Sequence, residues 1–129
     1  MKKIRMVIGV LGMDQHEVGA VAVSRLLRDA GMEIIYLGRF NTPTGIVKTS
    51  IEEDADAIGL SCHSWEYLHY VPELLKMLND QRLNIPVVIG GSVITPGDSD
   101  KLKDMGVAAV FGPSTTNDEL VESIQQLVS

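Results

Sequence analysis

The sequence predicts an α/β fold: a flavodoxin-like (Rossmann-like) doubly wound parallel sheet of five strands in the order 2-1-3-4-5, with helices on both faces. Short apolar segments alternate along the chain with longer segments whose apolar residues recur at helical spacing. Segments such as Ile58-Gly59-Leu60 and Val87-Val88-Ile89 are apolar on both faces, as parallel strands covered by helices are. A chain of 129 residues, 45% of them hydrophobic, is long enough for one core, so we expect a single domain over residues 1–129.

The alternation defines ten elements, with each strand followed by a helix. We expect strands at Ile4–Val10, Glu33–Leu37, Ala57–Ser61, Pro86–Ile89 and Ala108–Phe111. We expect helices at Val18–Ala30, Pro43–Glu53, Tyr67–Asp80, Asp98–Met105 and Asn117–Val128. Gly31 ends the first helix, and Thr42 caps the second, with Pro43 in its first helical position. Thr116 and Glu119 have the spacing of a capping box at the start of the last helix.

Composition and charge exclude several classes of protein. The formal charge is −6, so the chain lacks the basic face that nucleic-acid binding requires. Cys62 is the only cysteine, which excludes an internal disulfide and a thiolate zinc cluster. No apolar run approaches the roughly 20 residues of a membrane-spanning helix, and no signal peptide is visible. We therefore expect a cytoplasmic protein with no membrane partner.

Small and polar residues follow four of the five predicted strands. The clusters are Asp14-Gln15-His16-Glu17-Val18-Gly19, Ser61-Cys62-His63-Ser64, Gly90-Gly91-Ser92 and Gly112-Pro113-Ser114-Thr115-Thr116. Glycines let a ligand approach the backbone closely, and the hydroxyls of Ser61 and Thr115 can bond a buried polar group. Because ligands of open parallel sheets bind outside the carboxyl ends of the strands, the sequence predicts one ligand site at this edge.

The first cluster also carries a residue that can bind a metal. Asp14 and His16 are two apart, so the carboxylate can accept the N–H of one imidazole nitrogen while the other nitrogen binds a metal. A free imidazole has a pKa of about 6.5, which leaves it able to ligate near neutral pH. The local alternative is an Asp14 N-cap followed by a solvent-exposed His16.

Taken together, these motifs resemble the cobalamin-binding domain of the coenzyme B12-dependent mutases, in particular its stand-alone small-subunit form. The resemblance covers nearly the whole chain and rests on Asp14-x-His16-x-x-Gly19, Ser61, Gly90-Gly91 and Phe111-Gly112-Pro113-Ser114-Thr115. Further segments, Thr42-Pro43, Glu53-Asp54-Ala55-Asp56 and Asp104-Met105-Gly106-Val107, look like the acyl-CoA mutase branch. Gly9-Val10-Leu11-Gly12-Met13-Asp14 is similar to the glutamate mutase small subunit.

The resemblance implies a site for adenosylcobalamin bound base-off. His16 would be the lower axial ligand of cobalt, oriented by Asp14, and no residue of this chain would be catalytic. The displaced nucleotide tail would pass between the first helix and the sheet, with Ser61 hydrogen-bonded to the buried base. The cofactor-binding residues would be Met13, Asp14, Gln15, His16, Glu17, Val18, Gly19, Ser61, His63, Gly90, Gly91, Ser114 and Thr115.

The same resemblance implies a function that this chain does not perform alone. It would be the small subunit of a carbon-skeleton mutase, an isomerase acting on an acyl-CoA, and would be inactive without a large subunit that contains a (β/α)8 barrel. Two alternatives remain open: a corrinoid carrier of a methyltransferase system, and a divergent B12 domain used for sensing or storage. Carriers have a helical bundle ahead of the B12 domain, whereas the first strand here begins near residue 4. A receiver domain would need a phosphoacceptor Asp where Ser61 stands.

Some residues depart from the family pattern or carry no chemistry. Val10 stands where many acyl-CoA mutases have Lys, His63 replaces a Leu, and Trp65 replaces a small residue, which bears on corrinoid choice and affinity. We expect Cys62 to pack as a small apolar group and His69 to lie on the surface. The acidic residues Glu52, Glu53, Asp54 and Asp56 are expected to form a solvated helix end and turn.

Overall fold

The computed structural model describes residues 3–10, 18–39, 41–62, 67–91, 94–112 and 115–128. The strands are β1 Arg5–Val10, β2 Glu33–Tyr36, β3 Ala57–Ser61, β4 Val87–Gly90 and β5 Ala109–Phe111. The helices are α1 Val18–Asp29, α2 Pro43–Glu52, α3 Tyr67–Asp80, α4 Pro96–Met105 and α5 Asn117–Val128. All neighbouring strands pair in parallel, in the order β2-β1-β3-β4-β5, which confirms the predicted fold class and topology.

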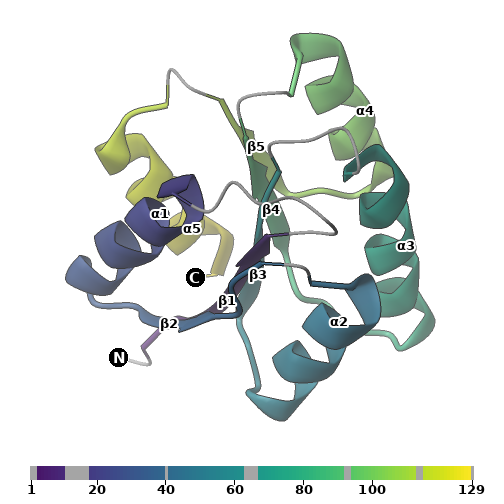
Figure 1. The fold of residues 1–129 in the computed structure, drawn as a ribbon, viewed down its shortest axis with the longest axis horizontal. Helices are drawn as coiled ribbons and strands as arrows, with labels where there is room; N and C mark the ends of the chain where they lie inside the picture. Colours follow the sequence, from purple (N-terminus) through teal and green to yellow (C-terminus); the bar gives the residue numbers. More distant parts are fainter. Residues whose placement is uncertain are drawn as a thin grey trace.

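The sheet lies between two layers of helices (Figure 1). Helices α1 and α5 cover one face, where Met6, Leu27 and Ile124 belong to one buried cluster. Helices α2, α3 and α4 cover the other face, where Ile46 and Leu74 belong to a second cluster. Strand β3 is buried along its whole length, as the apolar pattern predicts for a central parallel strand.

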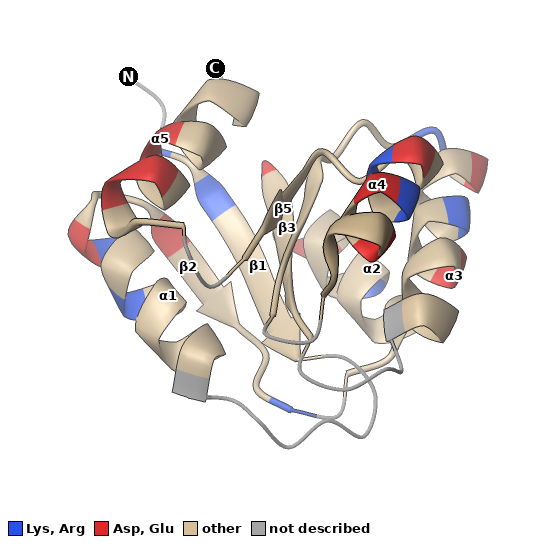
Figure 2. Ribbon diagram, turned by 90° about the horizontal axis from the view of Figure 1, so that it is seen from above, with Lys and Arg blue, Asp and Glu red and all other residues tan. Residues whose placement is uncertain are grey.

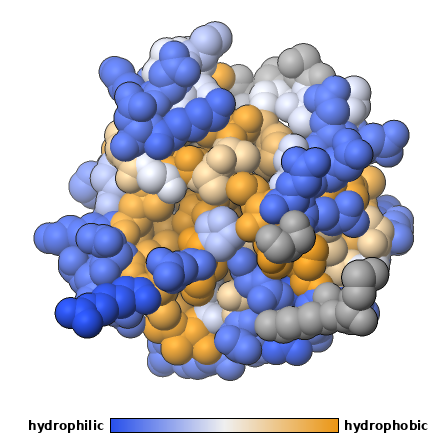
Figure 3. Space-filling view, turned by 180° about the vertical axis from the view of Figure 1, so that it is seen from behind, coloured by the Kyte–Doolittle hydropathy of each residue, from blue (hydrophilic) through white to orange (hydrophobic). Residues whose placement is uncertain are grey.

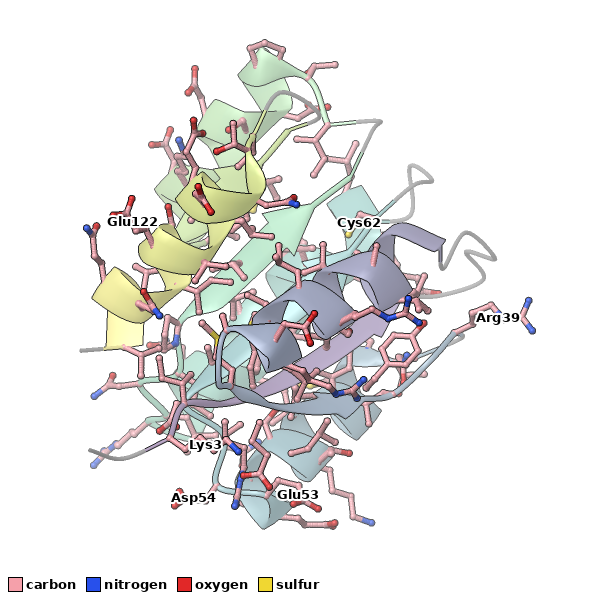
Figure 4. All side chains as sticks on the ribbon, turned by 90° about the vertical axis from the view of Figure 1, so that its left-hand side faces the viewer. Lys3, Arg39, Glu53, Asp54, Cys62 and Glu122 are labelled. Atoms are coloured by element: carbon pink, nitrogen blue, oxygen red, sulfur yellow. The ribbon has the colours of Figure 1, made fainter. Side chains whose placement is uncertain are left out.

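Most charged residues lie on the helices (Figure 2). The strands carry only Arg5 and Glu33, which face each other at the start of β1 and β2 and form an ion pair of 2.8 Å between Arg5 Nε and Glu33 Oε2. The hydrogen bond between the Arg5 guanidinium and the Glu33 carboxylate raises the pKa of Arg5 above its ordinary value. The acidic turn after α2 is solvated, as predicted, but Asp56 also accepts a hydrogen bond of 2.9 Å from the Arg5 backbone N–H. Figure 4 shows Glu53 and Asp54 at this end of the sheet, near Lys3.

The predicted elements are all present, with boundaries that differ by at most two residues. Helix α4 begins at Pro96 rather than at the predicted Asp98, because Thr95 is its N-cap and accepts a hydrogen bond of 3.1 Å from the Asp98 N–H. This is the Thr-Pro start that the sequence reasoning recognised at Thr42 but not here. Strand β4 extends to Gly90, which pairs with both Ser61 and Phe111.

The amino ends of the strands carry an apolar groove on the side of the molecule seen in Figure 3. Its apolar lining includes Leu75, Leu83, Ile85, Met105 and Leu127. Lys76 is the one charged residue among its described lining, so this groove has no set of groups suited to acid–base or metal chemistry. None of the described helices is both long and apolar enough to span a membrane.

Candidate functional site: a cavity at the carboxyl edge of the sheet

The strand order places a crevice at the carboxyl ends of the inner strands. Strand β1 is flanked by β2 and β3, so the chain leaves β1 and β3 toward opposite sides of the sheet. Ligands of doubly wound sheets bind at this kind of switch point. Helix α1, which follows β1, lies on one face of the sheet, and α2 and α3 lie on the opposite face, as Figure 1 shows from the carboxyl edge.

A cavity of about 360 Å³ lies at this position, between α1, α5 and the sheet. The described residues that line it are Met6, Ile8, Gly19, Ala20, Val23, Gly59, Leu60, Ser61, Val88, Ile89, Gly90, Gly91, Phe111, Gly112, Thr115, Thr116, Asn117, Leu120 and Ile124. Among these, only Ser61, Thr115, Thr116 and Asn117 have polar side chains. The cavity is therefore mostly apolar with a few polar groups, which is typical of a site for an organic ligand.

Five of the residues that the sequence analysis assigned to a cofactor line this one cavity. They are Gly19, Ser61, Gly90, Gly91 and Thr115. They come from the start of α1, the ends of β3 and β4, and the segment before α5, so the fold brings together positions up to 96 residues apart (from 19 to 115). Ser61 is buried, with 8% of its surface exposed.

The other assigned residues cannot be placed in the same way. Met13, Asp14, Gln15, His16, Glu17, His63 and Ser114 lie outside the residues that the structure describes. Val18 is described only as the first residue of α1. The position of the Asp14–His16 pair thus stays a prediction, although α1 begins at Val18, two residues after His16, as the sequence indicated.

At the mouth of the cavity, close approach of the backbone requires a glycine at position 91. A Cβ atom at Gly91 would lie 1.6 Å from the carbonyl oxygen of Cys62, a distance no side chain can adopt unless the backbone moves. Residue 62 is held against β4 by a hydrogen bond of 2.8 Å from its N–H to the Gly90 carbonyl. A Cβ atom at Gly90 would be in ordinary contact, 3.7 Å from the Phe111 oxygen.

Sequence reasoning missed the inner end of the cavity. Met6, Ile8, Gly59, Val88 and Ile124 line it, and all were expected only as core or strand residues. One signal was present: a glycine in the middle of a buried strand often marks a place where something approaches the backbone closely. A Cβ atom at Gly59 would lie 2.6 Å from the Cε atom of Met6, so the missing side chain enlarges the space under the helices.

Two other residues with reactive side chains, Cys62 and His69, do not line the cavity. Cys62 is buried in the cluster under α2, α3 and α4, as expected for a packing residue, and Figure 4 shows it near the carboxyl edge. His69 is exposed on α3 and makes an edge-on ring contact with Tyr70, as expected for a surface residue. The described residues contain no group of three or more His, Cys, Asp or Glu able to hold a metal ion.

Comparison with known proteins identifies the family. Residues 4–122 match the B12 binding domain family. The chain is 36% identical over 126 residues to the 2-hydroxyisobutanoyl-CoA mutase small subunit of Aquincola tertiaricarbonis, covering 98% of this chain and 93% of that protein. It is 35% identical over 126 residues to the pivalyl-CoA mutase small subunit of Xanthobacter autotrophicus, covering 98% and 84%.

A solved structure with the same fold agrees with this match. A cobalamin-binding protein from Desulfitobacterium hafniense superposes with a TM-score of 0.85 at 22% identity, covering 99% of this chain and 60% of that one. At this identity the likeness concerns the fold alone, whereas the sequence matches above extend through nearly all elements. The chain therefore belongs to the B12-binding domain family, and its cofactor is cobalamin.

Proposed function

We propose that this chain is the cobalamin-binding small subunit of an adenosylcobalamin-dependent acyl-CoA mutase, and that it holds the cofactor base-off with His16 as the lower axial ligand of cobalt. The observation that carries the proposal is the cavity between α1, α5 and the sheet. It is lined by five of the residues that the family resemblance assigned to the cofactor: Gly19, Ser61, Gly90, Gly91 and Thr115.

The described residues fit such a tail. Gly19, Gly90 and Gly91 line the cavity and place no side chain on its wall. The hydroxyl groups of Ser61 and Thr115 supply hydrogen-bonding capacity along an otherwise apolar wall. The cavity is already open in the folded chain, so the ordering cost of binding falls on the ligand more than on the protein.

The loop before α1 would hold the corrin ring and the metal. The imidazole of His16 would bind cobalt through one nitrogen and donate its other N–H to Asp14, which would fix the tautomer and strengthen the ligand. Met13, Gln15, Glu17 and Val18 would line the lower corrin face, and His63 and Ser114 would be further cofactor-binding residues. When bound, the cofactor supplies radical chemistry through homolysis of its Co–C bond, and the protein's part is to position and tune it.

Two features support a separate large subunit acting on an acyl-CoA. The two relatives of similar length are named as small subunits of acyl-CoA mutases, and the matches to them span nearly all of this chain. The groove at the amino edge has Lys76 as the one charged residue of its described lining and no set of groups suited to acid–base or metal chemistry. The substrate would therefore bind in a partner, whose (β/α)8 barrel would cover the upper corrin face.

The test is electron paramagnetic resonance of cob(II)alamin bound to uniformly 15N-labelled protein. We expect a nitrogen hyperfine pattern that differs between labelled and unlabelled protein, because the axial nitrogen then belongs to the protein. His16→Ala should abolish this dependence on the label. His69→Ala is the matched control, since it removes an exposed imidazole on α3 and should leave the pattern unchanged. A pattern that is insensitive to the label would contradict His16 ligation.

The role of Asp14 has its own test. Asp14→Asn keeps the size of the side chain but removes the charge that orients the imidazole, so we expect histidine ligation to persist with lower affinity, about 10- to 100-fold. The measurement is the cobalamin dissociation constant, together with the spectrum of the bound cobalt. Wild-type affinity in Asp14→Asn would exclude Asp14 as the orienting group.

A further inference from the structure

Asn41 joins the segment after β2 to the end of β1. Its side-chain Nδ2 group donates hydrogen bonds to two carbonyl oxygens, that of Val10 at 3.1 Å and that of Gly38 at 2.7 Å. Its backbone N–H also donates to the Val10 carbonyl, at 3.1 Å, and the Val10 N–H donates to the Gly38 carbonyl, at 3.0 Å. These hydrogen bonds, which we call the Asn41 clamp, tie the last residue of β1 to the segment that leads into α2.

The clamp is itself held in place from both sides. Gly38 has a φ of 75°, in the left-handed region that glycine adopts without strain, and its carbonyl accepts two of the clamp's hydrogen bonds. Thr42 caps α2 by accepting a hydrogen bond of 3.1 Å from the Gly45 N–H, and Ile46 in the first turns of α2 is fully buried. Asn41 is therefore fixed between a packed helix and the sheet.

An asparagine side chain suits this place because both of its partners are carbonyl oxygens. Only a donor can bond them, and one amide NH2 group has an N–H for each. Gly9 leaves room for the side chain, since a Cβ atom there would lie 3.0 Å from Nδ2 and 3.3 Å from Cγ of Asn41. An aspartate would keep the size of the side chain but would set acceptor oxygens against both carbonyls.

The clamp acts on the point where the chain leaves β1. Val10 is the last residue of this strand, and on its other side it is paired in register with Ser61, which lines the cavity. Because the peptide unit is planar, two hydrogen bonds on the Val10 carbonyl fix the direction in which the chain leaves the strand. His16 follows six positions later in the sequence (from 10 to 16).

We propose that Asn41 is a positioning residue for the cobalt ligand: by holding the Val10 carbonyl, it orients the root of the segment that carries His16 and favours ligation. The inference rests on the proposed function, because it assumes that His16 ligates cobalt. Asn41 does not line the cavity, so it acts through Val10 and not through the nucleotide tail. The physical basis is entropic, since a segment with a fixed root has fewer conformations to lose when it is ordered around the metal.

The experiment uses two readouts on the folded apoprotein. Titration with cob(II)alamin gives the dissociation constant, and electron paramagnetic resonance of the saturated, uniformly 15N-labelled protein gives the share of the spectrum that depends on the label. Asn41→Ala should raise the dissociation constant by about fivefold, the effect of one lost hydrogen bond, and should lower the label-dependent share. Asn41→Asp should have at least as large an effect, although it preserves the shape of the side chain.

A second variant perturbs the clamp without replacing Asn41. Gly9→Ala places a methyl group against the end of the Asn41 side chain and displaces its NH2 group from the two carbonyls. It should lower the label-dependent share in the same direction as Asn41→Ala. This variant keeps the inference testable if a substitution at position 41 prevents folding.

Two controls separate positioning from stability and from charge. Thr42→Ala removes the cap of α2 next to the clamp, so it should lower stability by a similar amount while leaving the label-dependent share at saturation unchanged. Asn79→Asp adds the same charge at an exposed position of α3, on the groove at the amino edge, and should leave both readouts at their wild-type values.

The outcomes distinguish the positioning role from the function beneath it. A wild-type label-dependent share in Asn41→Asp, or an equal loss of that share in Thr42→Ala, would overturn the positioning role while leaving His16 ligation intact. A wild-type spectrum that does not respond to the label would overturn the proposed ligation and the positioning role together.

Discussion

The glycines around the cavity differ in what a side chain would meet. At Gly91 the obstacle is the carbonyl oxygen of Cys62, which is backbone and cannot turn aside. At Gly59 it is the end of the Met6 side chain, which can rotate. The same substitution should therefore affect folding at one position and ligand binding at the other.

Gly91→Ala should destabilise the fold by about 1–3 kcal/mol, because the β3 and β4 ends must separate to admit the methyl group. The measurement is the free energy of unfolding in urea. Gly97→Ala is the control, since its nearest neighbour is the Thr95 hydroxyl at 4.0 Å and alanine suits a helix better than glycine. A Gly91→Ala variant as stable as Gly97→Ala would contradict the close approach of the two chain segments.

Gly59→Ala should preserve the fold but reduce cobalamin affinity. The new methyl group displaces Met6 into the cavity and shortens the space for the base, so we expect the dissociation constant to rise by about tenfold. Titration of the apoprotein, after circular dichroism has verified the fold, gives this value. Unchanged affinity would mean that no ligand atom reaches the level of Gly59.

Three helices begin with the same device, a threonine hydroxyl that accepts the N–H of the residue three positions later. Thr42 caps α2, Thr95 caps α4 and Thr116 caps α5, with distances of 3.1, 3.1 and 3.2 Å to the capped nitrogens. Two of these signals were recognised in the sequence. The third, at Thr95, was missed, and the predicted helix accordingly began two residues late.

Thr95→Ala should cost about 1 kcal/mol of folding free energy, because the Asp98 N–H loses its partner at the start of α4. Thermal or urea unfolding measures the loss. Thr95→Ser keeps the hydroxyl and should stay close to wild type. Cobalamin affinity should not change in either variant, since Thr95 does not line the cavity. Equal stability of the Ala and Ser variants would refute the cap.

At the scale of the whole molecule, binding and stability are linked. The cavity proposed to hold cobalamin exists only when α1, α5 and four strands are assembled, so we expect cobalamin to bind the folded state and not the unfolded chain. At a free concentration of 100 times its dissociation constant it should stabilise the fold by about 2.7 kcal/mol.

The measurement is the urea midpoint with and without cobalamin. A variant that weakens binding tenfold should lose about 1.4 kcal/mol of this increment. Gly59→Ala is the variant to use, with Thr95→Ala as the control, because the latter lowers stability without touching the cavity. A midpoint that saturating cobalamin does not move would be inconsistent with a site inside the fold.

The sequence by itself determined the strand and helix order, the parallel sheet, and the small residues at its carboxyl edge. It could do so because apolar periodicity, capping residues and turn glycines act over a few neighbouring positions. The family pattern likewise named Gly19, Ser61, Gly90, Gly91 and Thr115 before any contact between them was known, and these five do line one cavity.

Only the tertiary structure decided the depth and chemistry of that cavity. Met6, Ile8, Gly59, Val88 and Ile124 have the sequence signature of ordinary core residues, and their role depends on which faces of β1, β3, β4 and α5 meet. That choice is set by strand register and helix packing between residues far apart in the chain. Such pairings cannot be predicted from local sequence, because apolar periodicity is the same for a side chain that fills the core and for one that lines a cavity.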